Sequence, residues 1–172
     1  GLLYSIASIV YEDAYLAELK NACEALNFTG RRICFLPAPR LAERSGLPDI
    51  LIAPNAWHVE TETAEALAQF VERKGKLIIV GKGPERNEHD EPLQANLVSA
   101  LARATEIDAG LEPRKLRSIL LQHLAGPAIW PADSRGGIAW GVEWLDVHLG
   151  SRWLLNAVNL LRREATIRSV SY

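Results

Sequence analysis

The alternation of apolar and polar stretches is clearest between Asp49 and Gly83, where the sequence reads DILIAPNAWHVETETAEALAQFVERKGKLIIVGKG. Two unbroken apolar runs, 50–53 and 77–80, stand near the ends of this segment. Such runs are typical of parallel strands that are covered on both faces. Between them, apolar residues recur at three- and four-residue spacing, as on one helix face: Ala64, Leu67, Ala68, Phe70 and Val71. The pattern predicts a complete strand–helix–strand unit.

The ends of this predicted helix carry the expected local signals. Thr61 is the expected N-cap, and glutamates occupy the first turn. Arg73 and Lys74 occupy the last turn, so the charges at both ends complement the helix dipole. Gly75 stands where a left-handed residue commonly ends a helix. These signals agree with the periodicity and fix the helix between the two strands.

Strand and helix patterns also alternate on either side of this unit. We expect further strands at 2–6, 33–36 and 105–108, further helices at 12–27, 93–104 and 113–124, a connecting turn at 8–11, and a short helix or loop at 40–47. Strands that alternate with helices require crossover connections and therefore a parallel sheet. The sequence predicts an α/β fold of the flavodoxin-like type, with helices on both faces of the sheet.

The hydrophobic period changes after Gly137. Ile138, Trp140, Val142 and Trp144 alternate with smaller or polar residues, which is typical of a strand with one buried face. A turn at Gly150 would lead into a returning strand at 153–159, and the alternation resumes at 164–172. The sequence therefore predicts two domains, an α/β domain at 1–126 and a small antiparallel β module at 137–172.

Composition narrows the classes of partner. The chain has 172 residues, 48% hydrophobic content, a formal net charge of −2 and a pI of about 6.1. An acidic pI gives no electrostatic case for nucleic acid or an anionic membrane as partner. No apolar run reaches the roughly 18 residues of a membrane span. The N-terminus lacks the basic segment of a signal peptide, so we expect a cytoplasmic protein.

The chain contains no methionine and opens on Gly1 directly into strand-like sequence. We therefore expect a fragment of a longer protein. Cys23 lies on the apolar face of a predicted helix and Cys34 lies inside a predicted strand. We expect both to be free, buried thiols and not a disulfide.

Open parallel sheets bind ligands at the carboxyl ends of their strands. Asn55, Trp57 and His58 follow one central strand there, and as a ligand site they would form a polar platform beside an aromatic ring that stacks on a sugar. The alternative, which we favour, is a capping turn in which Asn55 bonds the backbone and Trp57 packs under the helix.

The loop after the next strand, PERNEHDEP, carries four further candidate ligand-binding residues: Glu85, Arg86, His89 and Asp90. Neighbouring residues on one loop do not converge on a metal, and no second His or Cys stands at ligand spacing. A solvated charged loop is the favoured interpretation. Because the phosphate-loop motifs and an exposed nucleophile at a strand-to-helix turn are also missing, we expect no cofactor, no metal and no catalytic residue.

Three tail tryptophans admit two interpretations. Trp140, Trp144 and Trp153 could form a strip that stacks on carbohydrate, or they could fill the buried face of the β module. Aromatic residues dominate such cores, so we favour burial.

The segment LPDILIAPNAWHVETETAEALAQFVERKGKLIIVGKG resembles the trimerisation domain of β-galactosidases in family forty-two of the glycoside hydrolases. The likeness includes the strand ending in Ala-Pro, the aromatic-bearing turn, the glycine turn and the acidic loop NEHDEP. The closing segment, GVEWLDVHLGSRWLLNAVNLLRREATIRSV, is similar to the small C-terminal β module of those enzymes. Where that family usually has Gly-Gly before the second strand, this chain has Lys74-Gly75.

This resemblance implies a class I glutamine-amidotransferase-like domain that has lost its cysteine nucleophile. In that family a catalytic barrel precedes the domain, and the domain associates subunits and borders a neighbour's active site. It therefore implies a non-catalytic assembly and accessory role, a homo-oligomer (dimer or trimer), and a catalytic barrel elsewhere in the parent chain. A self-standing amidotransferase-like hydrolase and a carbohydrate-binding module remain as alternatives.

Overall fold

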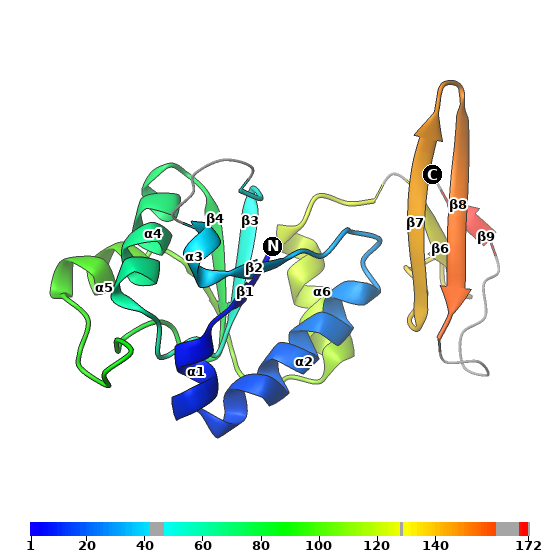
Figure 1. The fold of residues 1–172 in the computed structure, drawn as a ribbon. Coiled ribbons are helices and arrows are strands. Elements are labelled where there is room, and N and C mark those ends of the chain that lie inside the picture. The colour runs from blue at the N-terminus through cyan, green and yellow to red at the C-terminus, as the bar shows by residue number, and fades with distance from the viewer. Residues whose placement is uncertain (42–46, 128, 161–168, 172) are drawn as a thin grey trace. The chain divides into compact units, whose positions relative to one another are not determined.

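The computed structural model describes residues 1–41, 47–127, 129–160 and 169–171 (Figure 1). The chain divides into two units, each drawing on two stretches of sequence. The first unit comprises Gly1–Lys20 and Cys34–Leu111, and the second comprises Asn21–Ile33 and Glu112–Tyr172. Within the described residues, no helix combines the length and the apolar character that crossing a membrane requires.

The first unit is built on a five-stranded parallel sheet in the order β2-β1-β3-β4-β5. Its strands are short: β1 (Leu2–Tyr4), β2 (Phe35–Pro37), β3 (Ile50–Pro54), β4 (Lys76–Val80) and β5 (Thr105–Ile107). The predicted α/β fold is confirmed, and the strand order is that of flavodoxin-like proteins.

The central strands β3 and β4 pair along their whole length, from Ile50 opposite Lys76 to Pro54 opposite Val80. Alternate side chains point to opposite sheet faces, and both sets are buried. Leu51 and Ala53 belong to a hydrophobic cluster with α4 (Thr61–Glu72) and α5 (Ala95–Leu101), which lie beside each other in Figure 1. Ile52 and Ile78, on the other face, are also shielded from solvent. Burial on both faces explains the unbroken apolar runs.

Both predicted caps of α4 are displaced by one residue. Glu60 is the N-cap, and Thr61 begins the helix. At the other end Lys74, with φ of 66°, takes the left-handed conformation that we expected of Gly75. Hydrogen bonds from Lys74 N to Val71 O and from Gly75 N to Phe70 O form a Schellman motif. Gly75 is needed for a different reason, because an added Cβ would lie 2.5 Å from the Phe70 ring.

The connection after β1 is also different from the prediction. Residues 8–11 were expected to form a turn, but they belong to α1 (Ile6–Tyr11), which precedes α2 (Asp13–Asn27). Ser5 begins α1 as an N-cap whose side chain accepts a hydrogen bond from Ser8 N. That serine cap supplies the start signal that the periodicity of so short a helix does not give.

Strand β2 begins two residues later than predicted, so Cys34 precedes it and is exposed. Both cysteines are free, as expected, but only Cys23 is partly buried. The predicted helix or loop at 40–47 begins as α3 (Ala38–Leu41), and 42–46 lie outside the described residues.

The second unit contains the end of α2, helix α6 (Pro113–His123) and two small antiparallel sheets. Strand β6 (Trp130–Ala132) pairs with β9 (Ser169–Ser171), while β7 (Val142–Leu149) pairs with β8 (Arg152–Asn159). The predicted hairpin is confirmed. The third predicted strand is partly outside the described residues, and its described part pairs with β6 and not with the hairpin.

Trp144 anchors the start of β7. Its side chain is buried, its indole N–H donates to Ile129 O at 2.9 Å, and its ring fills the space where Gly30 would otherwise carry a Cβ. Gly30, with φ of 67°, is suited to this close approach. Trp140 is half-buried and contacts Phe28 edge-on. Of the three tryptophans, Trp153 contradicts the predicted burial, because half of it is exposed and its ring stacks on His148.

Arg117 ties the other parts of this unit together. Its guanidinium donates to the carbonyls of Phe28 in one segment and of Ile138 and Ala139 in another. Burial, with a smaller contribution from Arg114, lowers the pKa of Arg117. Carbonyl oxygens therefore replace part of the water that this half-buried cation has lost, while its Nε makes no hydrogen bond to a described residue.

Candidate functional site

Two left-handed residues lead the chain out of the central strands at their carboxyl ends. Asn55 follows β3 with φ of 42°, and Gly81 follows β4 with φ of 84°. Asn55 N donates to Val80 O, and Asn55 Oδ1 accepts from Lys82 N at 3.2 Å. An added Cβ at Gly81 would lie 3.0 Å from Asn55 Oδ1 and 3.0 Å from Ala109 Cβ. Asn55 therefore supports the backbone turn, and the sharp turn after β4 carries no reactive side chain.

His58 lies at the centre of this edge and is only 3% exposed. Its Nε2 is 2.9 Å from Asp90 Oδ1, and its Nδ1 lies 3.8 Å from Glu12 Oε1. Nδ1 makes no hydrogen bond to a described residue. The His58 carbonyl accepts from Ser5 Oγ at 3.0 Å and from Ser8 Oγ at 2.5 Å. The first turn of α1 thus holds the His58 backbone while two carboxylates face its ring.

Aromatic side chains enclose the His58 ring. Tyr11, at the end of α1, stacks on it with ring centroids 4.5 Å apart, and Trp57 contacts it edge-on at 5.0 Å. The Tyr11 hydroxyl also donates to Glu88 O at 3.1 Å. Aromatic packing excludes water from the imidazole, while the Asp90 carboxylate beside it is 54% exposed and remains solvated.

The acidic loop 84–92 is charged and largely exposed, and it also folds onto this ring. Arg86 donates to both the carbonyl and the Oδ1 of Asp90, at 2.6 and 3.0 Å. Asn87 Oδ1 accepts from the backbone N–H groups of His89 and Glu91. Asp90 has a left-handed φ of 59°, which directs it toward His58. The loop is a closed hydrogen-bonded turn, in which the side chains of His89 and Asp90 are 73% and 54% exposed.

Two carboxyl groups of this loop, those of Asp90 and Glu88, have lowered pKa values. The hydrogen bond from His58, and next the Arg86 guanidinium, holds the pKa of Asp90 below its usual value. The backbone amide of Glu88 itself, together with Thr61 N, lowers the pKa of Glu88. Thr61 N donates to Glu88 Oε2 at 2.9 Å, so this glutamate caps α4 from the loop. A carboxylate at a helix N-terminus is favoured by the helix dipole.

Trp57, Lys82 and Glu85 form the more open part of the edge. The Trp57 indole N–H donates to Glu85 Oε2 at 3.1 Å, and Lys82 Nζ lies 3.9 Å from the centre of the Trp57 ring. These side chains, with Gly81, Gly83 and Glu106, line a cavity of about 310 Å³. The cavity joins an aromatic surface to charges of both signs, which suits a polar, uncharged ligand better than an anion.

The arrangement lacks the geometry of nucleophilic catalysis. Both ring nitrogens of His58 face carboxylates, while the hydroxyls of Ser5 and Ser8 donate to its carbonyl. A serine or cysteine nucleophile must instead bond the ring that accepts its proton. Cys34 precedes β2, away from the carboxyl ends, and Cys23 belongs to the second unit. Across the described ranges, no group of three His, Cys, Asp or Glu side chains could hold a metal ion.

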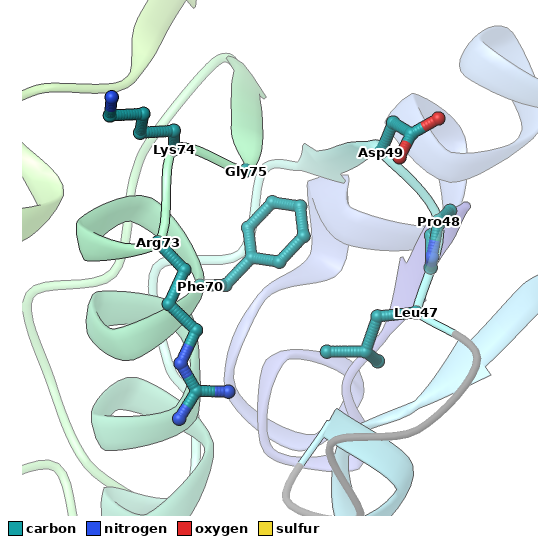
Figure 2. A pocket seen from close by; sticks show the side chains of 7 residues that line it. All are labelled: Leu47, Pro48, Asp49, Phe70, Arg73, Lys74 and Gly75. Carbon is teal, nitrogen blue, oxygen red and sulfur yellow. The ribbon is translucent and has the colours of Figure 1, made fainter.

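A second cavity, of about 350 Å³, lies at the opposite ends of β3 and β4. Figure 2 shows the Phe70 ring between the end of α4, with Arg73 and Lys74, and the segment Leu47–Asp49 that leads into β3. It stands at the amino ends of the strands, and its wall is the Schellman turn described above. This position makes it a packing feature of the helix terminus and not a candidate ligand site.

The structure brings six of the seven candidate residues together: Asn55, Trp57, His58, Glu85, Arg86 and Asp90. His89 lies on the same loop but points away. Ser8, Tyr11 and Glu12 were not among the predicted site residues, because the sequence pattern placed them in a turn and at the start of a helix. The available signal was the serine pair at positions 5 and 8, which is typical of a helix start.

Comparison with known proteins agrees with this fold. No protein-family model and no curated protein matches the sequence. Among solved structures, the chain is similar to the apo exo-carrageenase GH42 from Bacteroides ovatus, with a TM-score of 0.70 and 17% identity. The match covers 92% of this chain and 22% of the exo-carrageenase. The resemblance inferred from the sequence is confirmed at the level of the fold.

A second structure is Gan42B, a GH42 β-galactosidase, with a TM-score of 0.42 and 16% identity over 90% of this chain and 20% of that one. This score is too low to establish a shared fold. By these coverages, the chain spans about a fifth of the length of either protein.

Proposed function

We propose that this chain is a non-catalytic assembly and accessory part of a larger GH42-type glycoside hydrolase. In this proposal it associates subunits and borders a neighbouring active site, and a catalytic barrel elsewhere in the parent protein performs the hydrolysis. The α/β part, 1–126, and the β module, 137–172, would act as two domains of this accessory segment.

The observation that carries the proposal is the likeness to one segment of a GH42 protein over 92% of this chain. The geometry of the carboxyl edge supports it. His58 is enclosed by Tyr11 and Trp57 and engaged by Asp90, so the most chemically capable side chain is used for packing. The exposed apolar side chains of both units also favour association over chemistry.

Sedimentation velocity of the purified chain over a wide concentration range tests the assembly role. We expect reversible association to a dimer or trimer and no hydrolysis of galactosides. A strictly monomeric chain at high concentration would remove the assembly role. Turnover of an amide, ester or glycoside that Glu85→Ala and His89→Ala abolish would favour the self-standing hydrolase instead.

Carbohydrate binding is a second candidate, favoured by the cavity beside Trp57. A sugar there could stack on the indole while Glu85 accepts from its hydroxyls, once Lys82 moves off the ring. Calorimetric titration with galactosides checks this function. Heat that is retained in Trp57→Ala would exclude the cavity as the binding site.

A further inference from the structure

The β7–β8 hairpin, labelled in Figure 1, has one sheet face that is largely exposed to solvent. The register of the two strands places alternate residues on this face, here called the apolar face: Glu143, Leu145, Val147, Leu149, Arg152, Leu154, Asn156 and Val158. Every one of these residues is exposed or half-buried. Leu149, Leu154 and Val158 are 59%, 50% and 57% exposed.

The opposite face of the hairpin is different. Val142 and Trp144 lie on it and are buried, and Trp144 is hydrogen-bonded to Ile129. The hairpin is therefore anchored through Val142 and Trp144, at the start of β7 and on one face only. A two-stranded sheet is at best marginally stable by itself in water, so five large aliphatic side chains on the other face call for a cover.

The charges at the two ends of the apolar face indicate which partner binds it. Glu143 stands beside Val158 at one end, and Arg152 stands beside Leu149 at the other. Six residues of strand separate the two charges, or about 20 Å, so they cannot pair within one hairpin. Neither has an ion-pair partner among the described residues.

A two-fold axis in the plane of the face and perpendicular to the strands reverses the strand direction of the second hairpin. The Arg152 end of one copy then lies over the Glu143 end of the other, twice per pair, with the aliphatic side chains between. A surface that complements itself in this way is the requirement for an isologous dimer. We propose that the apolar face of the β7–β8 hairpin is a self-association surface that binds the same face of a second copy of this chain.

The size of the face predicts the strength of this association. Eight residues per strand give a strip about 26 Å long, and two strands make it about 10 Å wide. Such a strip covers roughly 260 Å² per partner, about a third of the roughly 800 Å² that a standard specific interface buries, so pairing through it alone is weak. The two hairpins would pack as a small sandwich about 10 Å apart. We therefore expect reversible, concentration-dependent pairing and not a permanent dimer.

This inference rests on the proposed assembly function and names its surface. The first test is Leu154→Lys, which places a charge in the middle of the apolar face. Its matched control is Leu16→Lys, on α2, where the leucine is similarly exposed at 53%. By sedimentation velocity, Leu154→Lys should weaken association at least about tenfold, because it removes apolar contact and buries two ammonium groups in one dimer. The control should associate as the wild type does.

The second test reverses the two charges, both of which are on exposed side chains. Glu143→Arg and Arg152→Glu should each weaken self-association about threefold to tenfold, because like charges then meet at both ends. An equal mixture of the two variants should associate at least as well as the wild type, as a heterodimer. Raised salt should reduce all of these differences.

The outcomes separate this inference from the proposed function. An oligomeric wild type that Leu154→Lys leaves unchanged overturns the hairpin surface but keeps the assembly role. A mixture of charge variants that associates no better than each variant alone also overturns the surface. A wild type that stays monomeric at several hundred micromolar overturns both.

Discussion

The carboxyl edge of the first unit and the β7–β8 hairpin of the second use their side chains in opposite ways. At the edge, polar groups are interlocked: His58 is engaged by Asp90, Asp90 by Arg86, and Glu88 by Thr61. On the hairpin, Leu149, Leu154 and Val158 face solvent. A region whose polar groups are occupied by one another has little left to offer a substrate. A region with uncovered apolar side chains gains most by binding a partner.

The largest effect should come from breaking the anchor of the hairpin. Trp144→Ala removes a buried indole and its hydrogen bond to Ile129. We expect a loss of about 3–5 kcal/mol in the free energy of unfolding, measured by urea denaturation. Trp153→Ala is the matched control, since half of that side chain is already exposed. A similar loss in both variants would mean that the hairpin is not anchored on one face.

The next effect concerns the centre of the carboxyl edge. His58→Ala leaves Asp90 and Glu12 facing a cavity, so we expect a loss of about 1–3 kcal/mol in unfolding free energy. Amide hydrogen exchange should accelerate across loop 84–92, which His58 holds. His89→Ala, on the same loop but exposed, should change neither quantity. Unchanged exchange in His58→Ala would show that the loop is held by Arg86 and Asn87 alone.

The pH dependence of stability tests the contribution of Asp90 at the same edge. The hydrogen bond from His58, followed by Arg86, lowers the pKa of Asp90 in the folded state. Stability from this carboxylate is therefore complete above its unfolded pKa, about 3.9, and is lost as the pH falls through the lower folded value. The denaturation midpoints of the wild type and of Asp90→Asn should differ at about pH 6 to 7, where the aspartates are charged. The two midpoints should converge in acid. A difference that grows on acidification would contradict this sign.

The smallest effect belongs to the exposed rim of the edge. Lys82→Ala removes a cation above the Trp57 ring and an ion pair with Glu12 whose atoms are 3.9 Å apart. Because Lys82 is mostly exposed, we expect a cost below about 1 kcal/mol by thermal denaturation. Lys82→Arg should restore most of it. A larger loss would mean that this rim is structural and not an open cavity wall.

Local sequence patterns predicted most strands and helices of the first unit, but not all of its turns and helix ends. The runs at 50–53 and 77–80 identified the two central strands, because burial on both faces leaves no polar position. Helix α1 was missed, since two turns give too little periodicity and only its serine cap marks it. The left-handed residue of the Schellman motif is Lys74 and not Gly75, and the glycine at 75 instead leaves room for the Phe70 ring.

What the sequence alone determined is therefore the order and type of the main elements, because hydrophobic period is a local property of the chain. Only the tertiary structure decided that His58 would lie between Glu12 and Asp90, and that Trp144 would be buried while Trp153 is exposed. Those outcomes depend on strand order and on how loops return to the sheet. Side chains far apart in sequence meet only when the whole unit has closed, and no pattern along the chain records that meeting.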